Sequence, residues 1–290
     1  MIWYELMPLD TLFFRGAIPL ETGLPVSDVL FPPPPSVIKG AIWTAGKQDF
    51  SKDPSVKIHA ILLKKDDIYY AQAPYSWFIK KSENETKKEN EEKVIICAKE
   101  LEEKDTICSV NGQIPWVKEC GVKNIGGKWV DIEILKTSNE KKYKEERLFE
   151  NEDRVGIGID YKRKSVEKGK LFMARHIRLH QGVSIAIAID DEYGLGEKGV
   201  LQLGGERRMC RYEKIKTPPK LPSTNNGNYY VLTAPTVCTE ELLDKVFAAK
   251  TFITSGWRMR KQTHKDSQTW FCAGSVFTEK IGDECIALSQ

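Results

Sequence analysis

The same order of elements, one strand, one helix and two more strands, is predicted on both sides of a proline-rich linker. Before the linker these elements are Ile2–Met7, Ser36–Gly46, Val56–Leu63 and Ile68–Ala73. After it they are Tyr229–Ala234, Glu240–Ala249, Thr251–Trp257 and Gln268–Thr278. The assignments follow the spacing of apolar residues and the glycines and prolines between them. The repeated order is half of a ferredoxin-like pattern, so it predicts an α+β fold of two ferredoxin-like, RRM-like units, an arrangement that often serves RNA.

The linker, Thr217–Asn228, contains three prolines and a Ser-Thr-Asn-Asn-Gly run, which is typical of a connection between domains. A chain of 290 residues is also long enough for about two domains. We therefore expect an N-terminal domain over residues 1–216, the linker over 217–228 and a smaller C-terminal domain over 229–290. Charged stretches at Lys80–Asp105 and Lys136–Asp153 predict a large insertion at about 74–153. The second unit stops before a final helix and strand and is expected to be truncated.

Basic residues gather locally, although the whole chain carries only 44 − 41 = +3 charges, too few to mark a polyanion binder. Between Tyr161 and His180 there are seven basic residues and one acid, a balance of +6. This stretch includes a predicted strand, Lys170–Leu179, which a Gln181–Gly182 turn would join to the strand Val183–Ile189 as a hairpin. Another cluster, Arg258 to Lys265, follows Trp257. Aromatic stacking beside charge neutralisation is how proteins hold single-stranded RNA.

A glycine pair, Gly204–Gly205, precedes further basic residues that include Arg207, Arg208 and Arg211. Glycines let a backbone approach a phosphate and expose its N–H groups, and neighbouring arginines supply bidentate charge. Each feature also has a plainer interpretation. The glycine pair is compatible with a simple tight turn, the basic strands with solvated edge strands, and Trp257 with a core position.

Several function classes lack their signatures. The seven cysteines have no close pair, and the four histidines fit no metal template. No Walker loop, dinucleotide fingerprint or nucleophile elbow is present. We expect no catalytic residues, no metal and no cofactor. The amino end does not read as a secretory signal and no apolar run is long enough for a membrane helix, so a cytoplasmic location without membrane contact is expected.

Phrases in order along the chain resemble one protein family. The first are Asp10–Arg15, Phe31–Ser36 and Lys39–Ile42, and the later ones are Arg154–Asp160, Gly169–Phe172, Leu203–Arg208, Gly256–Trp257 and Ala273–Val276. In order and approximate spacing they resemble the family of the third-numbered subunit of the type III-B CRISPR effector, the Cmr complex. The resemblance covers nearly the whole chain. It departs at the carboxyl end, where family members commonly continue into a final helix and a Gly-Phe-Gly-like strand.

This resemblance implies a RAMP protein of two ferredoxin-like units that binds RNA and is not itself the nuclease. The family holds the five-prime, repeat-derived tag of the guide RNA (crRNA) within an antiviral ribonucleoprotein. Its protein partners are the large polymerase-like subunit and the first backbone subunit, and it meets target RNA only indirectly. The matching glycine-rich phrase, Leu203–Arg208, lies where the family places its RNA-facing loop.

We therefore expect Gly204, Gly205, Arg207 and Arg208 to grip RNA phosphates. Further cations expected to help are Arg15, Lys39, Arg163, Lys164, Arg175 and Arg258. Trp257 and His176 are expected to stack on bases. Two alternatives stay open at this point. One is a metal-independent ribonuclease that processes repeat RNA with a histidine such as His176. The other is a protein scaffold whose RNA contacts are incidental.

Overall fold

The computed structural model describes residues 1–16, 29–49, 51–81, 92–100, 114–137, 141–222, 227–255, 257–258 and 263–288. The chain forms two compact units, and each unit is assembled from three stretches. Unit 1 comprises Met1–Ile58, Arg147–Lys216 and Ile253–Ser267. Unit 2 comprises His59–Glu146, Thr217–Phe252 and Gln268–Gln290. This differs from the predicted division into 1–216 and 229–290. Most residues after 216 belong to the same unit as 59–146, and the stretch Ile253–Ser267 belongs to unit 1.

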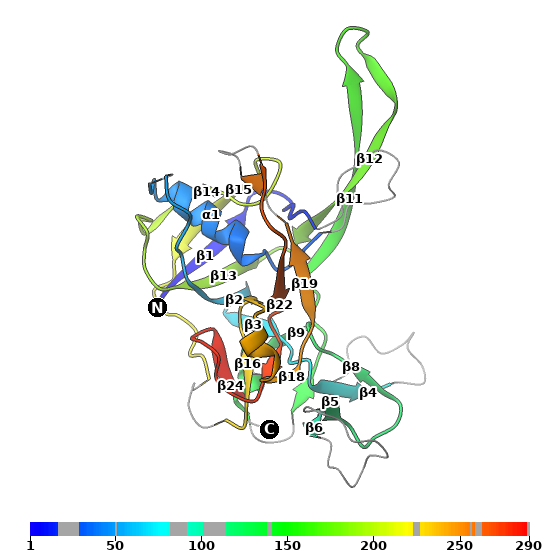
Figure 1. Ribbon diagram of the computed structural model, residues 1–290, viewed down its shortest axis with the longest axis vertical. Coiled ribbons are helices and arrows are strands. Elements are labelled where there is room, and N and C mark those ends of the chain that lie inside the picture. The colour runs from blue at the N-terminus through cyan, green and yellow to red at the C-terminus, as the bar shows by residue number, and fades with distance from the viewer. Residues whose placement is uncertain are drawn as a thin grey trace. The chain divides into compact units, whose positions relative to one another are not determined.

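Unit 1 contains four antiparallel strands in the order β14, β15, β1, β13 (Figure 1). Their bounds are Ile2–Pro8 (β1), Val183–Ile189 (β13), Lys198–Gln202 (β14) and Met209–Lys214 (β15). Tyr4 of β1 lies opposite Ile187 of β13, and Leu6 lies opposite Tyr212 of β15. Every residue of β13 is buried, which explains its nearly continuous apolar sequence.

One helix, α1 (Pro35–Ala45), packs beside β14 in this unit. Pro35 suits the first helical position, because its ring presets φ and its missing N–H has no partner to lose there. The helix buries Ile38, Ile42 and Trp43 and ends at Gly46, whose N–H is bonded to the carbonyl oxygen of Ile42. The predicted helix Ser36–Gly46 is thus confirmed to within one residue at each end.

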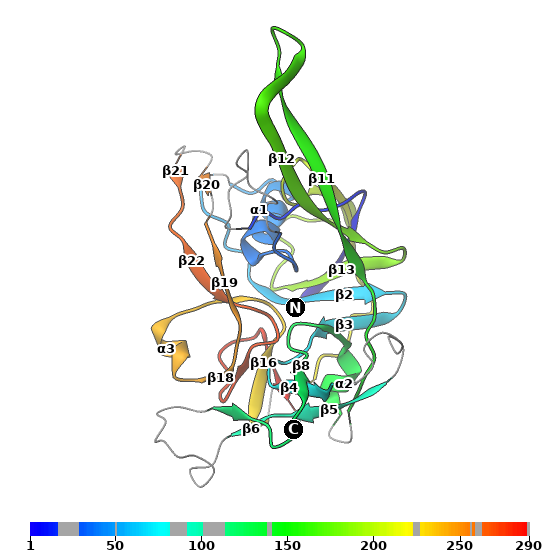
Figure 2. The same cartoon turned by 90° about the vertical axis from the view of Figure 1, so that its right-hand side faces the viewer.

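A long hairpin forms the second part of unit 1. Its strands are β11 (Phe149–Asp160) and β12 (Ser165–Leu179), which run side by side as a twisted ribbon (Figure 2). Two hydrogen bonds of 2.8 Å between the backbones of Leu12 and Ile177 tie its base to the segment that follows β1. The short strands β20 (Trp257–Arg258) and β21 (Thr263–His264) complete the unit.

This hairpin corrects the predicted pairing of Lys170–Leu179 with Val183–Ile189. The first of these strands pairs with β11 and the second with β1. The reason is burial. All seven residues of β13 are buried and need a place in the core, whereas much of β12 is exposed and needs only one neighbouring strand for its backbone hydrogen bonds.

The two faces of the hairpin differ in character. Because opposite residues share a face, Val155, Ile157 and Ile159 line up with Met173, Leu171 and Val166 across the strands. All of these except Met173 are exposed and apolar. On the other face the ring of Phe172 lies over Gly156, where an added Cβ would come within 2.2 Å of it. The apolar face is therefore the open one.

Unit 2 is built from short strands in several small sheets. One sheet region contains β2 (Ile58–Lys65), β3 (Ile68–Gln72) and β9 (Trp129–Asp131), and another contains β4 (Trp77–Lys80), β5 (Lys93–Cys97), β8 (Val122–Asn124) and β10 (Lys142–Tyr143). A two-stranded ribbon joins β6 (Lys99–Glu100) and β7 (Pro115–Trp116). The C-terminal strands are β16 (Tyr229–Leu232), β17 (Thr236–Val237), β18 (Val246–Ala248), β22 (Gln268–Phe271), β23 (Val276–Phe277) and β24 (Cys285–Leu288). Leu232, Phe271, Phe277 and Cys285 form a core cluster there. Strand β19 (Thr251–Thr254) begins in unit 2, and its last two residues belong to unit 1.

The fold is α+β but richer in strands than the sequence predicts. The described residues contain three helices, α1, α2 (Ile132–Lys136) and α3 (Glu240–Leu243). The predicted helix Glu240–Ala249 stops at Leu243, because Val246–Ala248 instead form β18 and bury Phe247 and Ala248. A ferredoxin-like unit has two helices, whereas the described part of unit 1 has one.

Within the described ranges, no helix has the length and apolarity needed to cross a bilayer.

Candidate nucleic-acid interface

The glycine-rich turn between β14 and β15 is held by backbone hydrogen bonds. Leu203 N–H donates to Arg208 O at 2.8 Å, Arg208 N–H donates to Gly205 O at 3.3 Å, and Gly205 N–H donates to Phe13 O at 2.8 Å. Gly204 has φ of +85°, and a Cβ there would lie 2.5 Å from Phe13 O. Only glycine fits such a backbone and such a close approach. The glycine pair is thus a turn that is packed directly on the Phe13–Phe14 segment.

The next two residues of the turn carry side chains on a backbone that normally favours glycine or asparagine. Glu206 and Arg207 have φ of 53° and 54°. Positive φ at both central residues, with the bond from Arg208 N–H to Gly205 O, is the pattern of a type I′ turn. Non-glycine residues held in this region cost stability and cluster at functional sites. On this strained turn the Arg207 side chain is exposed to solvent.

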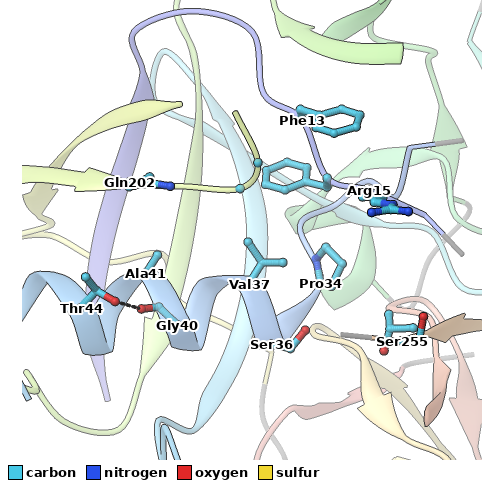
Figure 3. Close-up of a pocket in the computed structure, with 14 residues that line it drawn as sticks. Phe13, Arg15, Pro34, Ser36, Val37, Gly40, Ala41, Thr44, Gln202 and Ser255 are labelled. Carbon is cyan, nitrogen blue, oxygen red and sulfur yellow. Dashed lines mark hydrogen bonds between the residues drawn. The ribbon is translucent and has the colours of Figure 1, made fainter. Parts of the chain in front are cut away.

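A cavity of about 480 Å³ opens beside this turn. Figure 3 shows α1 as one wall, with Val37 pointing toward the segment that carries Phe13 and Arg15. The lining combines apolar residues with one cation, four hydroxyl groups and one amide. It consists of Phe13, Phe14, Arg15, Pro34, Ser36, Val37, Gly40, Ala41, Thr44, Gln202, Gly204, Gly205, Thr254 and Ser255. An apolar pocket with a few polar groups is typical of ligand sites. A nucleotide, with its flat base and charged phosphate, has this mixed chemistry.

The predicted cations fall into two groups. Arg15 lines the cavity and is exposed, as is Arg207 on the turn. Arg163 and Lys164 lie at the tip of the β11–β12 hairpin, where the Arg163 side chain is 84% exposed and 3.9 Å from Asp160. Within the described part of the chain the structure shows no ion pair for Arg15 or Arg207. These two are the cations best placed to meet a phosphate at the cavity.

The second group is already engaged with carboxylates or other partners. Arg175 donates two hydrogen bonds to Asp153, of 2.7 and 3.0 Å, across the hairpin. Arg208 donates to Asp10 at 2.5 Å and to Glu206 at 2.8 Å, and its side chain is only 18% exposed. Lys39 lies in α1, half-buried, with interactions of its own. The predicted basic surface of +6 is therefore partly neutralised by the acids of β11.

His176 does not offer a ring face to a base. It is completely buried, its ring stacks on Phe13 with centroids 5.1 Å apart, and its Nδ1 lies 3.1 Å from the Thr11 hydroxyl. Burial lowers the pKa of His176, while Glu206 opposes that shift from 3.5 Å away. The stacking prediction for His176 is thus corrected. Because solvent and RNA do not reach the ring, the ribonuclease alternative based on this histidine gains no support.

The aromatic platform predicted at Trp257 and its neighbour Arg258 lies partly outside the described residues. Both belong to strand β20, with Trp257 opposite His264 of β21, and their side chains are outside the described part. Among the residues that are described, no three histidine, cysteine or acidic side chains come together as metal ligands would.

Sequence reasoning missed a set of charged residues next to the turn. Asp10, Glu152, Arg154 and Arg178 converge with Arg208 at the base of the hairpin. The available signal was the run of charged residues at the start of β11, which pairs with the basic strand β12 in a register that sets Glu152 opposite His176. That register could not be read from either strand alone.

Comparisons with known proteins agree with this picture of the fold. The family model described as CRISPR-associated protein (Cas_Cmr3) matches residues 125–285, more than half of the chain. A curated protein, the CRISPR system CMR subunit Cmr3 of Saccharolobus solfataricus, is 26% identical over 156 residues, which are 49% of each protein. The chain therefore spans about half the length of this relative in that match.

Two solved structures share the fold over most of the chain. The first is a chain of the Type III-B Cmr-beta bound to cognate target RNA, with a TM-score of 0.64 and 19% identity over 96% of this chain and 86% of that chain. The second is the same complex bound to cognate target RNA and AMPPnP, with a TM-score of 0.63 and 18% identity over 95% and 85%. At these identities the likeness concerns the fold.

Proposed function

Because the chain belongs to the CRISPR-associated Cmr3 family, we propose that it is a non-catalytic, guide-RNA-binding subunit of a type III-B CRISPR effector complex. In this role it caps the five-prime, repeat-derived tag of the crRNA. It bridges the large polymerase-like subunit to the first backbone subunit and meets target RNA only through the guide. The setting is antiviral defence in the cytoplasm. We also propose that its two units derive from ferredoxin-like RAMP modules.

The observation that carries this proposal is the convergence of Arg15 and the Gly204–Gly205 turn on one cavity. Arg15 supplies a charge for a phosphate, and the exposed Gly205 and Arg207 lie on the turn beside it. Val37, which is partly exposed, supplies apolar surface that suits a base. Single-stranded RNA is held by this combination of backbone neutralisation and apolar contact. The solved relatives that share this fold come from complexes bound to target RNA, which also supports the proposal.

Removing Arg15, which lines the cavity, or Arg207, on the turn beside it, should weaken RNA binding. We expect Arg15→Ala and Arg207→Ala each to raise the Kd for a single-stranded RNA that begins with the repeat-derived tag by about 5- to 10-fold. Each lost phosphate contact should also reduce the slope of log Kd against log salt by about 0.7. Fluorescence anisotropy of the full chain at several salt concentrations measures both quantities.

The matched control is Arg211→Ala, which removes an exposed arginine from β15, outside both the glycine-rich turn and the cavity lining. Its Kd should stay within about twofold of wild type, because the substitution leaves the turn and the cavity lining intact and removes only a solvent-screened charge. Equal losses in all three variants would show that binding reflects diffuse charge and not this site. Wild-type protein that fails to bind tag RNA, yet assembles with its partner subunits, would favour the scaffold function instead.

A further inference from the structure

Three guanidinium groups of unit 1 point at one carboxylate, that of Asp10, just after β1. Arg208 Nη1 lies 2.5 Å from Asp10 Oδ2. Arg154 Nη2, from β11, and Arg178 Nη2, from β12, lie 3.4 and 3.6 Å from Asp10 Oδ1. A single carboxylate needs one arginine for a bidentate pair. Three arginines around one anion are more typical of a site for phosphate.

Two further acids hold the arginines in this orientation. Glu152 accepts hydrogen bonds from the Nε atoms of both Arg154, at 2.8 Å, and Arg178, which leaves an Nη2 atom of each facing Asp10. Glu206 accepts from Arg208 Nη2 at 2.8 Å. The guanidinium groups are therefore fixed before any ligand arrives, which lowers the entropy lost on binding.

The Asp10 carboxylate lies where another anion can reach the same arginines. Its side chain is 45% exposed, and Arg154 and Arg178 are also reachable from solvent. The backbone N–H of Thr11, together with Arg154 and Arg208, holds the pKa of Asp10 below its usual range, so it is an anion at neutral pH. Three arginines and three acids make the cluster neutral, and an added anion must therefore replace an existing one.

We propose that Arg154, Arg178 and Arg208 form a binding site for a phosphate group of single-stranded RNA, and that Asp10 occupies this site in the free protein. A phosphodiester carries the same charge as the carboxylate and accepts the same Nη hydrogen bonds. Arg208 also donates its backbone N–H to Gly205, which places the site next to the glycine-rich turn. The inference thus rests on the proposed function and adds a second phosphate contact to it.

Removing the internal anion should strengthen ligand binding. We expect Asp10→Asn to lower the Kd of the full chain for tag RNA, and for inorganic tripolyphosphate, by about 3- to 10-fold. Arg178→Gln should raise both Kd values by about 5-fold and reduce the salt slope for RNA by about 0.7. Anisotropy for RNA and isothermal calorimetry for tripolyphosphate give these values, and circular dichroism checks that each variant is folded.

The matched control is Asp153→Asn, which removes the same charge from β11 of the same unit, where it pairs with Arg175 and not with the three arginines around Asp10. Its affinity should change by less than about twofold. An equal gain in Asp10→Asn and Asp153→Asn, or no loss in Arg178→Gln, would overturn the inference. If Asp10→Asn does not fold, the Arg178→Gln result alone decides.

The two proposals can fail separately. If wild-type protein does not bind tag RNA, but its affinity for tripolyphosphate follows Asp10 and Arg178, the proposed function falls and the phosphate site stands. If Arg15→Ala and Arg207→Ala weaken RNA binding while Asp10→Asn and Arg178→Gln change nothing, the function stands and this site falls.

Discussion

At the scale of single residues, what lies across a strand decides what a basic side chain can do. Arg163 and Arg175 are both basic residues of one sequence cluster, yet Arg163 is largely exposed and Arg175 is bound by two hydrogen bonds to Asp153. Asp153 stands 22 residues away in sequence. The register of β11 and β12 therefore neutralises Arg175 across the strands, whereas Arg163 at the tip of the hairpin stays largely exposed.

His176 should make stability depend on pH at the residue scale. Burial lowers its pKa from the ordinary value of 6.5, so below that value the unfolded chain binds a proton that the folded chain does not. The stabilising contribution is full above about pH 6.5 and is lost as pH falls toward the lowered folded value. We expect the urea midpoint of wild-type protein to decrease between pH 7.5 and 5.

A paired variant tests whether this histidine is responsible. Thr11→Val with His176→Phe removes both members of the buried hydrogen bond and leaves no orphaned polar partner. Its urea midpoint should be much flatter over the same pH range. His180→Gln, which changes a histidine that is not fully buried, should keep the wild-type decline. An unchanged decline in the paired variant would assign the effect to other groups.

At the scale of elements, α1 serves as both core helix and cavity wall. Gly40 lines the cavity, and an added Cβ there meets no atom within 4 Å. Glycine inside a helix costs about 0.5–1 kcal/mol relative to alanine. Gly40 therefore lowers the stability of the helix at a position where the lack of a side chain keeps the cavity wide.

Gly40→Ala should separate stability from binding. We expect the free energy of unfolding to rise by about 0.5–1 kcal/mol, while the Kd for tag RNA rises by about 2- to 5-fold because the methyl group narrows the cavity. Urea unfolding and anisotropy measure the two effects. Ala45→Gly, near the end of the same helix and outside the cavity lining, is the reverse control. It should lower stability and leave the Kd unchanged.

Elements with a strong burial pattern were predictable from the sequence, and pairings between distant segments were not. Val183–Ile189 has the bounds that its apolar run predicts, because all seven residues are buried. Glu240–Ala249 has helical spacing, but its second half joins β23 as a strand, since contacts far along the chain outweigh local propensity. In the same way the glycine turn could be read from its residues, whereas the Asp10 cluster required the register of β11 and β12.

At the scale of the whole molecule, the two units cannot be separated by one cut. In unit 2, Ile61 N–H donates to Thr233 O at 2.9 Å, Thr233 Oγ1 donates to His59 O at 2.7 Å, and Tyr75 N–H donates to Gly274 O at 2.9 Å. These bonds join residues 59–146 to the C-terminal part of the chain. The linker expected at 217–228 begins where the chain passes from unit 1 into unit 2, but the chain also crosses between the units at other points, so this linker does not divide the chain into two domains.

A fragment of residues 1–216 should be poorly folded, although the sequence predicts it as a domain. It would lose Ile253–Ser267 from unit 1 and would leave the buried backbone partners of Thr233 and Gly274 unpaired, which costs about 1–3 kcal/mol for each group. Near-UV circular dichroism and hydrogen exchange should show loss of fixed packing. The control is the full chain nicked at a protease site placed between Thr217 and Lys220, which should stay folded as two associated pieces. A cooperatively folded 1–216 fragment would restore the division that the sequence predicts.

The open aliphatic face of the β11–β12 hairpin has a consequence for handling the protein. Val155, Ile157, Ile159, Val166 and Leu171 are exposed along one ribbon, and an apolar surface of this kind promotes association between copies. Colloidal behaviour of the purified chain should therefore depend on concentration, and light scattering should rise before any unfolding is detected. Low protein concentration, or a mild non-ionic detergent during purification, is the appropriate condition for the binding measurements.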